Sequence, residues 1–283
     1  MTDPIADHPK LLAVSDLHTG YTDNRELVEK LQPDNDQDWL IVAGDVGEKV
    51  ADIQRTLADL RQRFHTVVWV PGNHELWTHP ADPVKLRGEE RYRHLVEICR
   101  ELGVFTPEDP YQVWTGPAGP VTVAPLFVLY DYTFLPPGVL TQEAALELAY
   151  ETGIVCTDEQ LLHPDPYPSR AEWCHARIEY SLQRLDSRDP KLPTVLINHF
   201  PLTRLPTLVL RYPQFAQWCG TELTHDWHVR YDAAAVVYGH LHIPRTTYED
   251  GVRFEEVSLG YPREWRPRGR TLPWPRQILP APA

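Results

Sequence analysis

The sequence has few cysteines, and their spacing matches neither a metal site nor a disulfide framework. No pair has the C-x-x-C spacing of zinc and redox motifs, and the four lie far apart in the chain, at Cys99, Cys156, Cys174 and Cys219. Isolated cysteines of this kind are typical of buried free thiols in a reducing compartment. The sequence therefore argues against a disulfide-stapled fold and against a cysteine-based zinc site.

Long apolar runs are also missing. No stretch approaches the ~20 consecutive apolar residues that a membrane-spanning helix needs. The first residues have neither the basic region nor the apolar region of a signal peptide. We therefore expect a cytoplasmic protein that makes no membrane contact.

Basic residues are fewer than acidic residues in this chain. The chain has 27 Lys and Arg residues against 40 Asp and Glu residues, which gives a net charge of -13. Nucleic-acid binding depends on a basic surface, so we expect no nucleic-acid partner. A small anionic substrate stays compatible with this charge if metal ions supply positive charge at the site.

The composition and the apolar pattern predict an ordinary soluble domain with a buried sheet. Hydrophobic residues make up 42% of the 283 residues and charged residues 24%. Apolar runs that indicate buried strands alternate with amphipathic stretches that indicate helices. The predicted strands are residues 11–15, 39–43, 66–70, 194–197 and 233–238. This alternation predicts a parallel α/β sheet, and hairpins within 111–129 and 246–259 make the sheet system mixed.

Each of these five runs ends in a group that can bind a metal. The groups are Asp16 with His18, Asp45, Asn73, His199, and His240 with His242. Because the carboxyl ends of neighbouring parallel strands meet at one edge of a sheet, we expect these side chains to converge. Each one alone has an ordinary reading, as a helix cap or a core histidine, but their number indicates two ions. Oxygen and imidazole donors without thiolate favour Mn, Fe, Zn or similar divalent ions.

The run 66–75 supplies a further group. The strand stops at Pro71-Gly72, and Asn73, His74 and Glu75 follow directly. Adjacent residues in a turn point in different directions, so Asn73 can face a metal while His74 stays free. Two ions would clamp a phosphoryl oxygen and activate a water molecule. The leaving alkoxide then needs a proton, and we predict that His74 donates it, with Glu75 orienting the imidazole.

Taken in order, these blocks resemble the calcineurin-like (binuclear) metallophosphoesterases over roughly residues 11–260. The resemblance implies an α/β fold, a four-layer α/β/β/α sandwich of two mixed sheets. It also implies that Asp45 bridges the two ions, one held with Asp16, His18 and His242 and the other with Asn73, His199 and His240. In the second block the family usually continues with an aspartate, whereas this chain has Val46-Gly47-Glu48.

We expect a single domain over residues 1–283. Two of its segments contain none of these motif blocks. The first, at about 130–193, is predicted as a helical insertion that roofs the site, or else as additional outer helices. The second, at about 262–283, is rich in Pro and Arg and is expected to lie extended on the surface. The candidate substrate contacts are Tyr130, Tyr132, Arg204 and Arg263. Surface ion pairs are the alternative explanation for both arginines.

The leading functional hypothesis is a phosphatase that hydrolyses a small phosphomonoester by attack of a hydroxide that bridges the two metals. A phosphodiesterase acting on a cyclic nucleotide or another small diester is the alternative, because it needs the same metals and differs in pocket shape. A non-catalytic interaction module is disfavoured, since such a protein would be expected to have lost ligands or His74. The sequence leaves the oligomeric state open.

Overall fold

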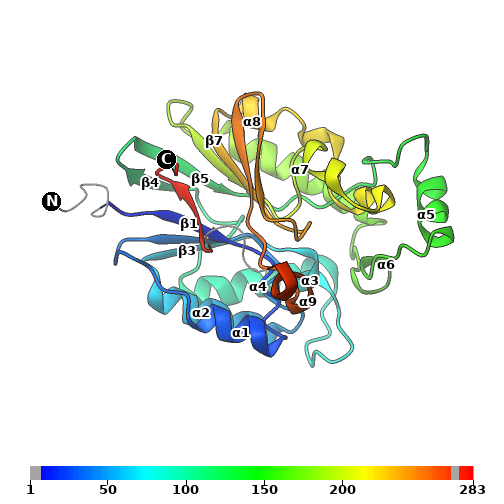
Figure 1. The fold of residues 1–283 in the computed structure, drawn as a ribbon, viewed down its shortest axis with the longest axis horizontal. Helices are drawn as coiled ribbons and strands as arrows, with labels where there is room; N and C mark the ends of the chain where they lie inside the picture. Colours follow the sequence, from blue (N-terminus) through cyan, green and yellow to red (C-terminus); the bar gives the residue numbers. More distant parts are fainter. Residues whose placement is uncertain (1–7, 269–273, 283) are drawn as a thin grey trace.

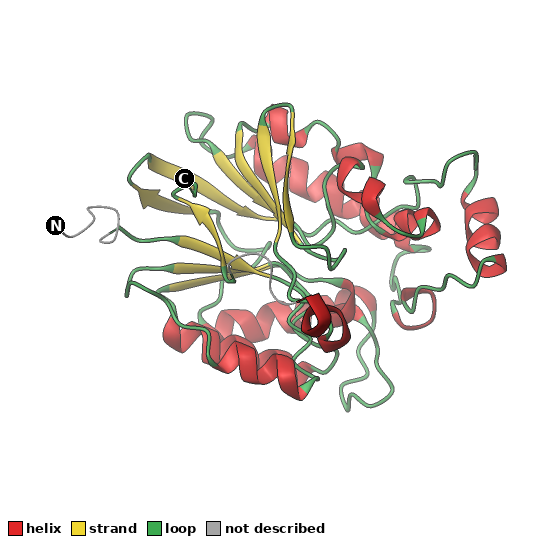
Figure 2. Ribbon diagram, viewed as in Figure 1, coloured by secondary structure: helices red, strands yellow, loops and turns green. Residues whose placement is uncertain are grey.

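The computed structural model describes residues 8–268 and 274–282. Two mixed β-sheets pack face to face, and helices lie on the outer face of each sheet (Figures 1 and 2). The predicted four-layer α/β/β/α sandwich is therefore confirmed. Within the described residues no helix is both long enough and apolar enough to cross a membrane.

The first sheet has the strand order β10-β1-β2-β3. Strands β1 (Leu11–Val14), β2 (Trp39–Val42) and β3 (Thr66–Trp69) are parallel, and β10 (Arg276–Leu279) pairs antiparallel with β1. The helices below this sheet in Figure 1 are α1 (Thr22–Glu29), α2 (Val50–Arg63) and α4 (Gly88–Leu102). Helix α2 shows why they form there, because Ile53, Leu57 and Leu60 repeat at helical spacing and are all buried.

The second sheet has the strand order β4-β5-β6-β7-β9-β8. Its strands are β4 (Gln112–Gly116), β5 (Gly119–Pro125), β6 (Thr194–Ile197), β7 (Ala233–Tyr238), β8 (Arg245–Glu249) and β9 (Val252–Glu256). The four central strands are parallel, while β4 and β8 form antiparallel edge hairpins. The predicted turn between β8 and β9 is present, with φ of 49° at Asp250 and 80° at Gly251.

Helices α7 (Arg170–Asp186) and α8 (Trp227–Arg230) cover the second sheet, and α5 (Gln142–Glu151) and α6 (Asp158–Leu161) project from one end of the sandwich (Figure 1). The segment predicted as a helical insertion thus contains α5, α6 and α7. Short 3₁₀ helices follow β6, namely η1 (Leu205–Val209), η2 (Pro213–Trp218) and η3 (Glu222–Thr224).

Strands β1, β2, β3 and β6 are buried on both faces. Leu11 and Ala13 pack between the two sheets, whereas Leu12 and Val14 belong to the larger cluster that includes the helices. This double burial explains why the strand sequences have no polar break. The first polar side chain that follows each strand therefore marks the edge of the sheet.

The expectation that the C-terminal tail is only an extended surface segment is wrong for its described part. Residues Pro262–Arg268 form helix α9, and Trp265 donates a hydrogen bond of 2.9 Å from Nε1 to Asn24 Oδ1. Strand β10 completes the first sheet, because the edge of β1 offers unpaired backbone groups. Residues 269–273 and 283 of the predicted tail, Arg270 among them, lie outside the described residues.

Candidate metal centre and active site

The predicted metal ligands converge from both sheets. Asp16 and His18 follow β1, Asp45 follows β2, Asn73 begins the short helix α3 (Asn73–Leu76) after β3, and His199, His240 and His242 follow β6 and β7. All except the partly buried His242 are less than 9% exposed. The structure thus brings together the side chains that the strand ends were expected to bring together.

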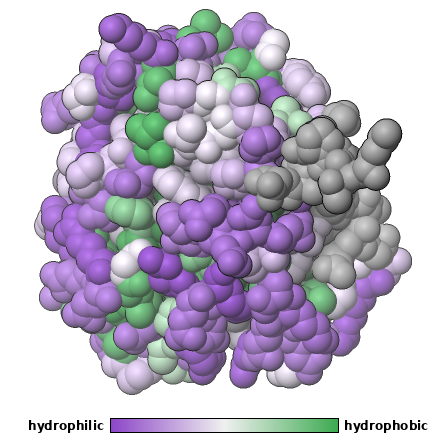
Figure 3. Space-filling model, turned by 90° about the vertical axis from the view of Figure 1, so that its left-hand side faces the viewer, coloured by the Kyte–Doolittle hydropathy of each residue, from purple (hydrophilic) through white to green (hydrophobic). Residues whose placement is uncertain are grey.

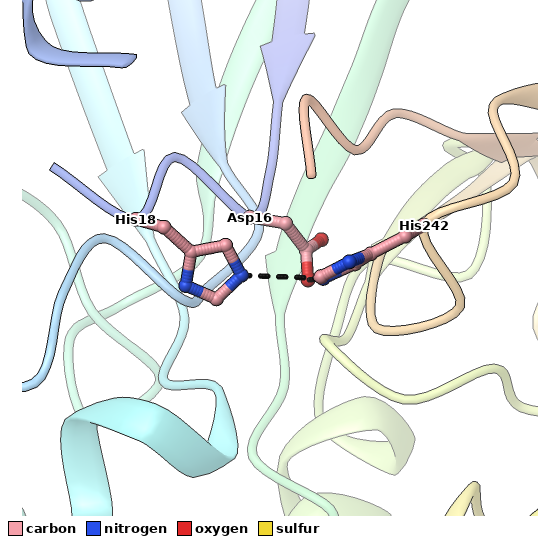
Figure 4. Close-up of side chains that lie close together, drawn as sticks. All are labelled: Asp16, His18 and His242. Atoms are coloured by element: carbon pink, nitrogen blue, oxygen red, sulfur yellow. Dashed lines mark hydrogen bonds and ion pairs between the residues drawn. The ribbon is translucent and has the colours of Figure 1, made fainter. Parts of the chain in front are cut away.

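One group consists of Asp16, His18 and His242, whose side chains point toward one another in Figure 4. His242 Nε2 lies 2.9 Å from Asp16 Oδ1 and 3.2 Å from His18 Nε2. Potential ligand atoms of the three residues all lie within 4.8 Å of one another. Two imidazole nitrogens and a carboxylate oxygen at such distances match the donor set of a divalent ion.

A second group surrounds Asp45. Its Oδ2 lies 3.5 Å from His199 Nε2 and 3.8 Å from His74 Nε2. Asn73 Oδ1 lies 3.2 Å from the same His199 nitrogen. Asp45 is a member of two three-residue clusters, one with Asp16 and His199 and one with His18 and His74. This central position is compatible with a carboxylate shared between two ions.

The polar groups of the site fit cations. His18 Nδ1 and His240 Nε2 are buried and have no hydrogen-bond partner within the described chain, which normally costs about 1–3 kcal/mol per group. Burial lowers the pKa of His18 and of His240 well below its usual value, so both imidazoles are neutral and can donate a lone pair. Burial and the charges of Glu75 and Asp16 raise the pKa of Asp45, and a nearby cation would offset this effect. The chain therefore supplies the oxygen and nitrogen donors of a divalent-metal site.

Five of the predicted ligands have a backbone conformation that residues other than glycine rarely adopt. The φ angles are positive at Asp16 (53°), His18 (42°), Asp45 (55°), His240 (71°) and His242 (56°). Such residues are uncommon and cluster at functional sites, where the surrounding structure holds them in place.

Two motif glycines are needed because a side chain at either position would collide with a carboxylate. A Cβ on Gly72 would lie 2.1 Å from Asp45 Oδ1, and a Cβ on Gly239 would lie 2.2 Å from Asp16 Oδ2. Each of these carboxylates therefore packs directly on the backbone of another block, which explains why glycine precedes Asn73 and His240.

The His74 imidazole contacts both polar and aromatic side chains. Its Nδ1 lies 3.1 Å from Glu48 Oε1, its Nε2 lies 3.3 Å from the Tyr261 hydroxyl, and its ring centroid is 3.6 Å from that of Trp77. Burial lowers the pKa of the His74 imidazole well below its usual value. The ring is thus held on one side by a carboxylate, and its Nε2 faces Asp45.

The predicted contact between Glu75 and His74 is corrected by the structure. The Glu75 carboxylate accepts backbone N–H bonds from Asp45 (2.9 Å), Val46 (2.7 Å) and Gly72 (2.9 Å). It turns back toward the N-terminus of its own short helix, where these donors satisfy it. Glu75 therefore fixes the loop that carries Asp45. The carboxylate beside His74 is Glu48, in the block that departs from the family pattern.

Sequence reasoning missed Asp158, which comes from α6 in the predicted insertion. This fully buried carboxylate accepts hydrogen bonds from Asn73 Nδ2 (2.8 Å), Trp77 Nε1 (2.6 Å) and the Tyr130 hydroxyl (3.0 Å). Because the amide nitrogen of Asn73 is engaged, its Oδ1 faces His199 and the centre. A single aspartate in a helical stretch gave no signal of this contact.

The C-terminal segment also reaches the site. Glu264 in α9 accepts a 2.7 Å bond from His242 Nδ1, which leaves His242 Nε2 for the centre. Burial works to lower the pKa of His242, but the carboxylates of Asp16 and Glu264 outweigh it and raise that pKa to about 10. Tyr261 stacks on His18, with ring centroids 4.4 Å apart. Neither residue belongs to a motif block, so neither could be identified from spacing.

A groove of about 520 Å³ opens beside the cluster. Its walls come from the ligand loops, from residues 154–158 of the insertion, from Leu210, Arg211, Tyr212 and Phe215, and from Tyr261, Arg263 and Glu264. Of the predicted substrate contacts, only Arg263 is among the lining residues.

The other three predicted substrate contacts make interactions within the protein. The Tyr130 hydroxyl binds Asp158, as described above, and the Tyr132 hydroxyl donates to Glu159 at 2.7 Å. Arg204 pairs with Glu222 at 3.6 Å, which matches the surface ion pair that was its alternative reading. The two tyrosines face into the protein because the chain leaving β5 is buried on both sides.

Comparison with known proteins identifies the family. A calcineurin-like phosphoesterase family model matches residues 9–244. The chain belongs to this family. The predicted family is thus confirmed, and with it the prediction of a metal-dependent phosphoric ester hydrolase.

Two matches in this family extend over nearly the whole chain. The [acyl-carrier-protein] phosphodiesterase PptH of Mycobacterium tuberculosis is 54% identical over 280 residues, which cover 99% of this chain and 86% of that protein. The crystal structure of phosphopantetheinyl hydrolase (PptH) from Mycobacterium tuberculosis superposes with a TM-score of 0.95 at 54% identity and covers 98% of both chains. The insertion and the C-terminal segment are therefore included in both matches.

Proposed function

We propose that this metallophosphoesterase is a phosphodiesterase that removes phosphopantetheine from an acyl carrier protein. The observation that carries this proposal is the 54% identity to an acyl-carrier-protein phosphodiesterase over 99% of the chain. It favours the alternative drawn from the sequence, a phosphodiesterase, over the leading hypothesis of a monoester phosphatase. The phosphorylated small molecule expected as substrate is then an arm attached to a protein.

The reaction is a hydrolysis at phosphorus. In a phosphopantetheinylated carrier protein, a phosphodiester joins a serine oxygen to the pantetheine chain. Water adds a hydroxyl group to phosphorus, the bond from phosphorus to the serine oxygen breaks, and a proton reaches that oxygen. The products are a carrier protein with a free serine and phosphopantetheine.

The proposed metal ligands are those that converge at the strand ends. When bound, two divalent ions such as Mn, Fe or Zn would activate water and stabilise negative charge on the phosphoryl oxygens. The chain would hold them with Asp16, His18, Asp45, Asn73, His199, His240 and His242. Glu75, Asp158 and Glu264 would then orient ligands without binding metal, through the hydrogen bonds already described.

His74 is proposed as the proton donor to the serine oxygen. Glu48 lies at its Nδ1, so the proton on that nitrogen can be held there while Nε2 faces the cluster. Burial keeps the free imidazole neutral, and the negative charge of a bound phosphodiester favours its protonated form again. The imidazole can therefore take up a proton when substrate binds and release it as the ester bond breaks.

The groove has room for the pantetheine arm. Its volume of about 520 Å³ lies within the range of small-molecule sites, ~300–1,000 Å³. Apolar side chains in its lining, among them Trp77, Ile154 and Leu210, can pack along a flexible aliphatic chain. Arg263 adds a cation that can approach the phosphate.

The test is a substrate panel with the manganese-reconstituted protein. A phosphopantetheinylated acyl carrier protein, simple phosphomonoesters and cyclic nucleotides are compared, and Asp45→Asn is the inactive control. We expect release of phosphopantetheine from the carrier protein, and its loss in Asp45→Asn. Faster turnover of monoesters than of any diester would instead restore the phosphatase hypothesis.

A further inference from the structure

An exposed apolar ridge borders the groove. It consists of Leu205, Leu208, Val209 and Tyr212, and these side chains are 37%, 68%, 47% and 49% exposed. The first three belong to η1, and Tyr212 also lines the groove. The ridge is therefore continuous with the groove wall.

The predicted insertion extends this wall. Val155, which is 66% exposed, lines the same groove as Tyr212. Helix α5 packs against η2, and Gln217 Nε2 donates to the backbone oxygen of Ala145 at 3.2 Å. The ridge and the insertion thus form one connected surface beside the metal ligands.

This surface differs from the other end of the sandwich. Figure 3 shows the end where the strands β1 to β3 begin, which is mostly hydrophilic with only small groups of hydrophobic residues. Exposed apolar groups that are contiguous and bordered by polar residues mark interaction sites, whereas scattered ones are normal on any protein. The ridge residues lie close together in the chain, within residues 205–212, and so differ from scattered exposed residues.

Two arginines add charge at the same place. Arg211 and Arg263 line the groove and are exposed, and neither forms an ion pair with any residue of the described chain. Their guanidinium groups lie over Tyr212 at 5.4 Å and over Tyr261 at 5.0 Å. In a chain with a net charge of -13, two exposed arginines at the groove favour an anionic partner.

The chemistry of the proposed substrate places its protein body here. The scissile phosphorus is one bond away from the serine oxygen of the carrier protein. While the arm occupies the groove, the surface around that serine must therefore lie against the groove mouth. We infer that the ridge and Arg211 dock the body of the carrier protein, by contacting apolar side chains and carboxylates that lie beside its modified serine. This inference rests on the proposed function.

The test separates docking from chemistry. The double variant Leu208→Ser/Val209→Ser changes two ridge residues that do not line the groove. Steady-state kinetics are measured with the phosphopantetheinylated carrier protein and with bis(p-nitrophenyl) phosphate, a small diester that has no protein body to dock. We expect KM for the carrier protein to rise about 10-fold or more, as for the loss of interface anchors, with kcat and small-diester turnover nearly unchanged.

The matched control is Val229→Ser. Val229 is 57% exposed and lies in α8, away from the groove lining, so its replacement should leave both substrates unaffected. A second variant, Arg211→Glu, should weaken carrier-protein cleavage most strongly at low ionic strength.

The results separate a failure of the docking surface from a failure of the proposed function. If the unaltered protein cleaves the carrier protein and the double variant has an unchanged KM, the docking surface is wrong and the function stands. Equal losses on both substrates would also overturn docking, because the ridge would then act through the fold. If the double variant instead dissociates a dimer without a change in KM, the ridge binds a second copy of this chain. If the unaltered protein does not cleave the carrier protein, the proposed function fails and the docking inference falls with it.

Discussion

Asp158 connects the predicted insertion to the metal centre, and Asp158→Ala tests this connection. The substitution removes the acceptor of three buried donors, on Asn73, Trp77 and Tyr130. Each donor left unsatisfied costs about 1–3 kcal/mol, so the free energy of unfolding should fall by several kcal/mol. The amide of Asn73 is then free to rotate, and its oxygen is no longer directed at the centre.

The expected effect on metal binding follows from the position of Asp158. It contacts Asn73, which we propose as a ligand, and loss of such partners typically weakens metal affinity ~10–100-fold. We therefore expect one of two manganese ions to bind 10–100-fold more weakly in Asp158→Ala, while the other is bound as before. The assay is calorimetric titration of metal-free protein with Mn²⁺, with near-ultraviolet circular dichroism to confirm the fold.

Two related variants make this test specific. Tyr130→Phe removes one donor of the same network without touching Asn73, so manganese affinity should not change. Asp158→Asn keeps an oxygen that can accept from Asn73 and Trp77, so its affinity should lie between those of the unaltered protein and Asp158→Ala. A folded Asp158→Ala protein that binds both ions with unaltered affinity would refute the positioning role.

Three further predictions concern the remaining groups. His74→Asn should lower kcat for the carrier protein ~10²–10⁴-fold and much less for a p-nitrophenyl ester, whose leaving group needs no proton; equal losses on both would argue against a proton donor. Glu75→Gln should lower the melting temperature, because a neutral amide bonds more weakly to three backbone donors, and an unchanged temperature would contradict this reading. Burial raises the pKa of all four thiols, those of Cys99, Cys156, Cys174 and Cys219. Iodoacetamide at pH 8 should therefore modify none of them in the folded protein and all of them in denaturant, as counted by intact mass. A thiol that reacts quickly in the folded protein would show that its site is exposed.

The strands and the polar groups at their ends could be predicted because one physical constraint governs both. A strand buried on two faces is mostly apolar, so charged or imidazole side chains such as Asp45 and His199 stand out where the strand ends. The predicted strand 194–197 agrees with β6 to the residue. Helix α2 follows the same rule, because its apolar residues repeat along the one face that is buried.

The contacts that orient the ligands could not be predicted, because they depend on how separate segments pack. Asp158, Glu48 and Glu264 are ordinary acidic residues in stretches with no motif, and only the fold brings them to Asn73, His74 and His242. Glu75 was assigned to its neighbour in sequence, yet its carboxylate binds the loop of another strand.

The tail was misread for a similar reason. Its Pro and Arg content favoured an extended surface segment, but the free edge of β1 and the side chain of Asn24 gave it tertiary partners. Composition describes what a segment prefers in isolation, whereas a partner elsewhere in the chain decides its final structure.

In the proposed reaction, water attacks phosphorus and the serine of a carrier protein is the leaving group. The decisive experiment is to incubate the phosphopantetheinylated carrier protein with the manganese-loaded enzyme in water labelled with heavy oxygen. We expect the carrier protein to return to an unlabelled free serine and the released phosphopantetheine to carry one heavy oxygen on its phosphate. A labelled serine, a phosphoserine left on the carrier protein, or no change in its mass would contradict this reaction.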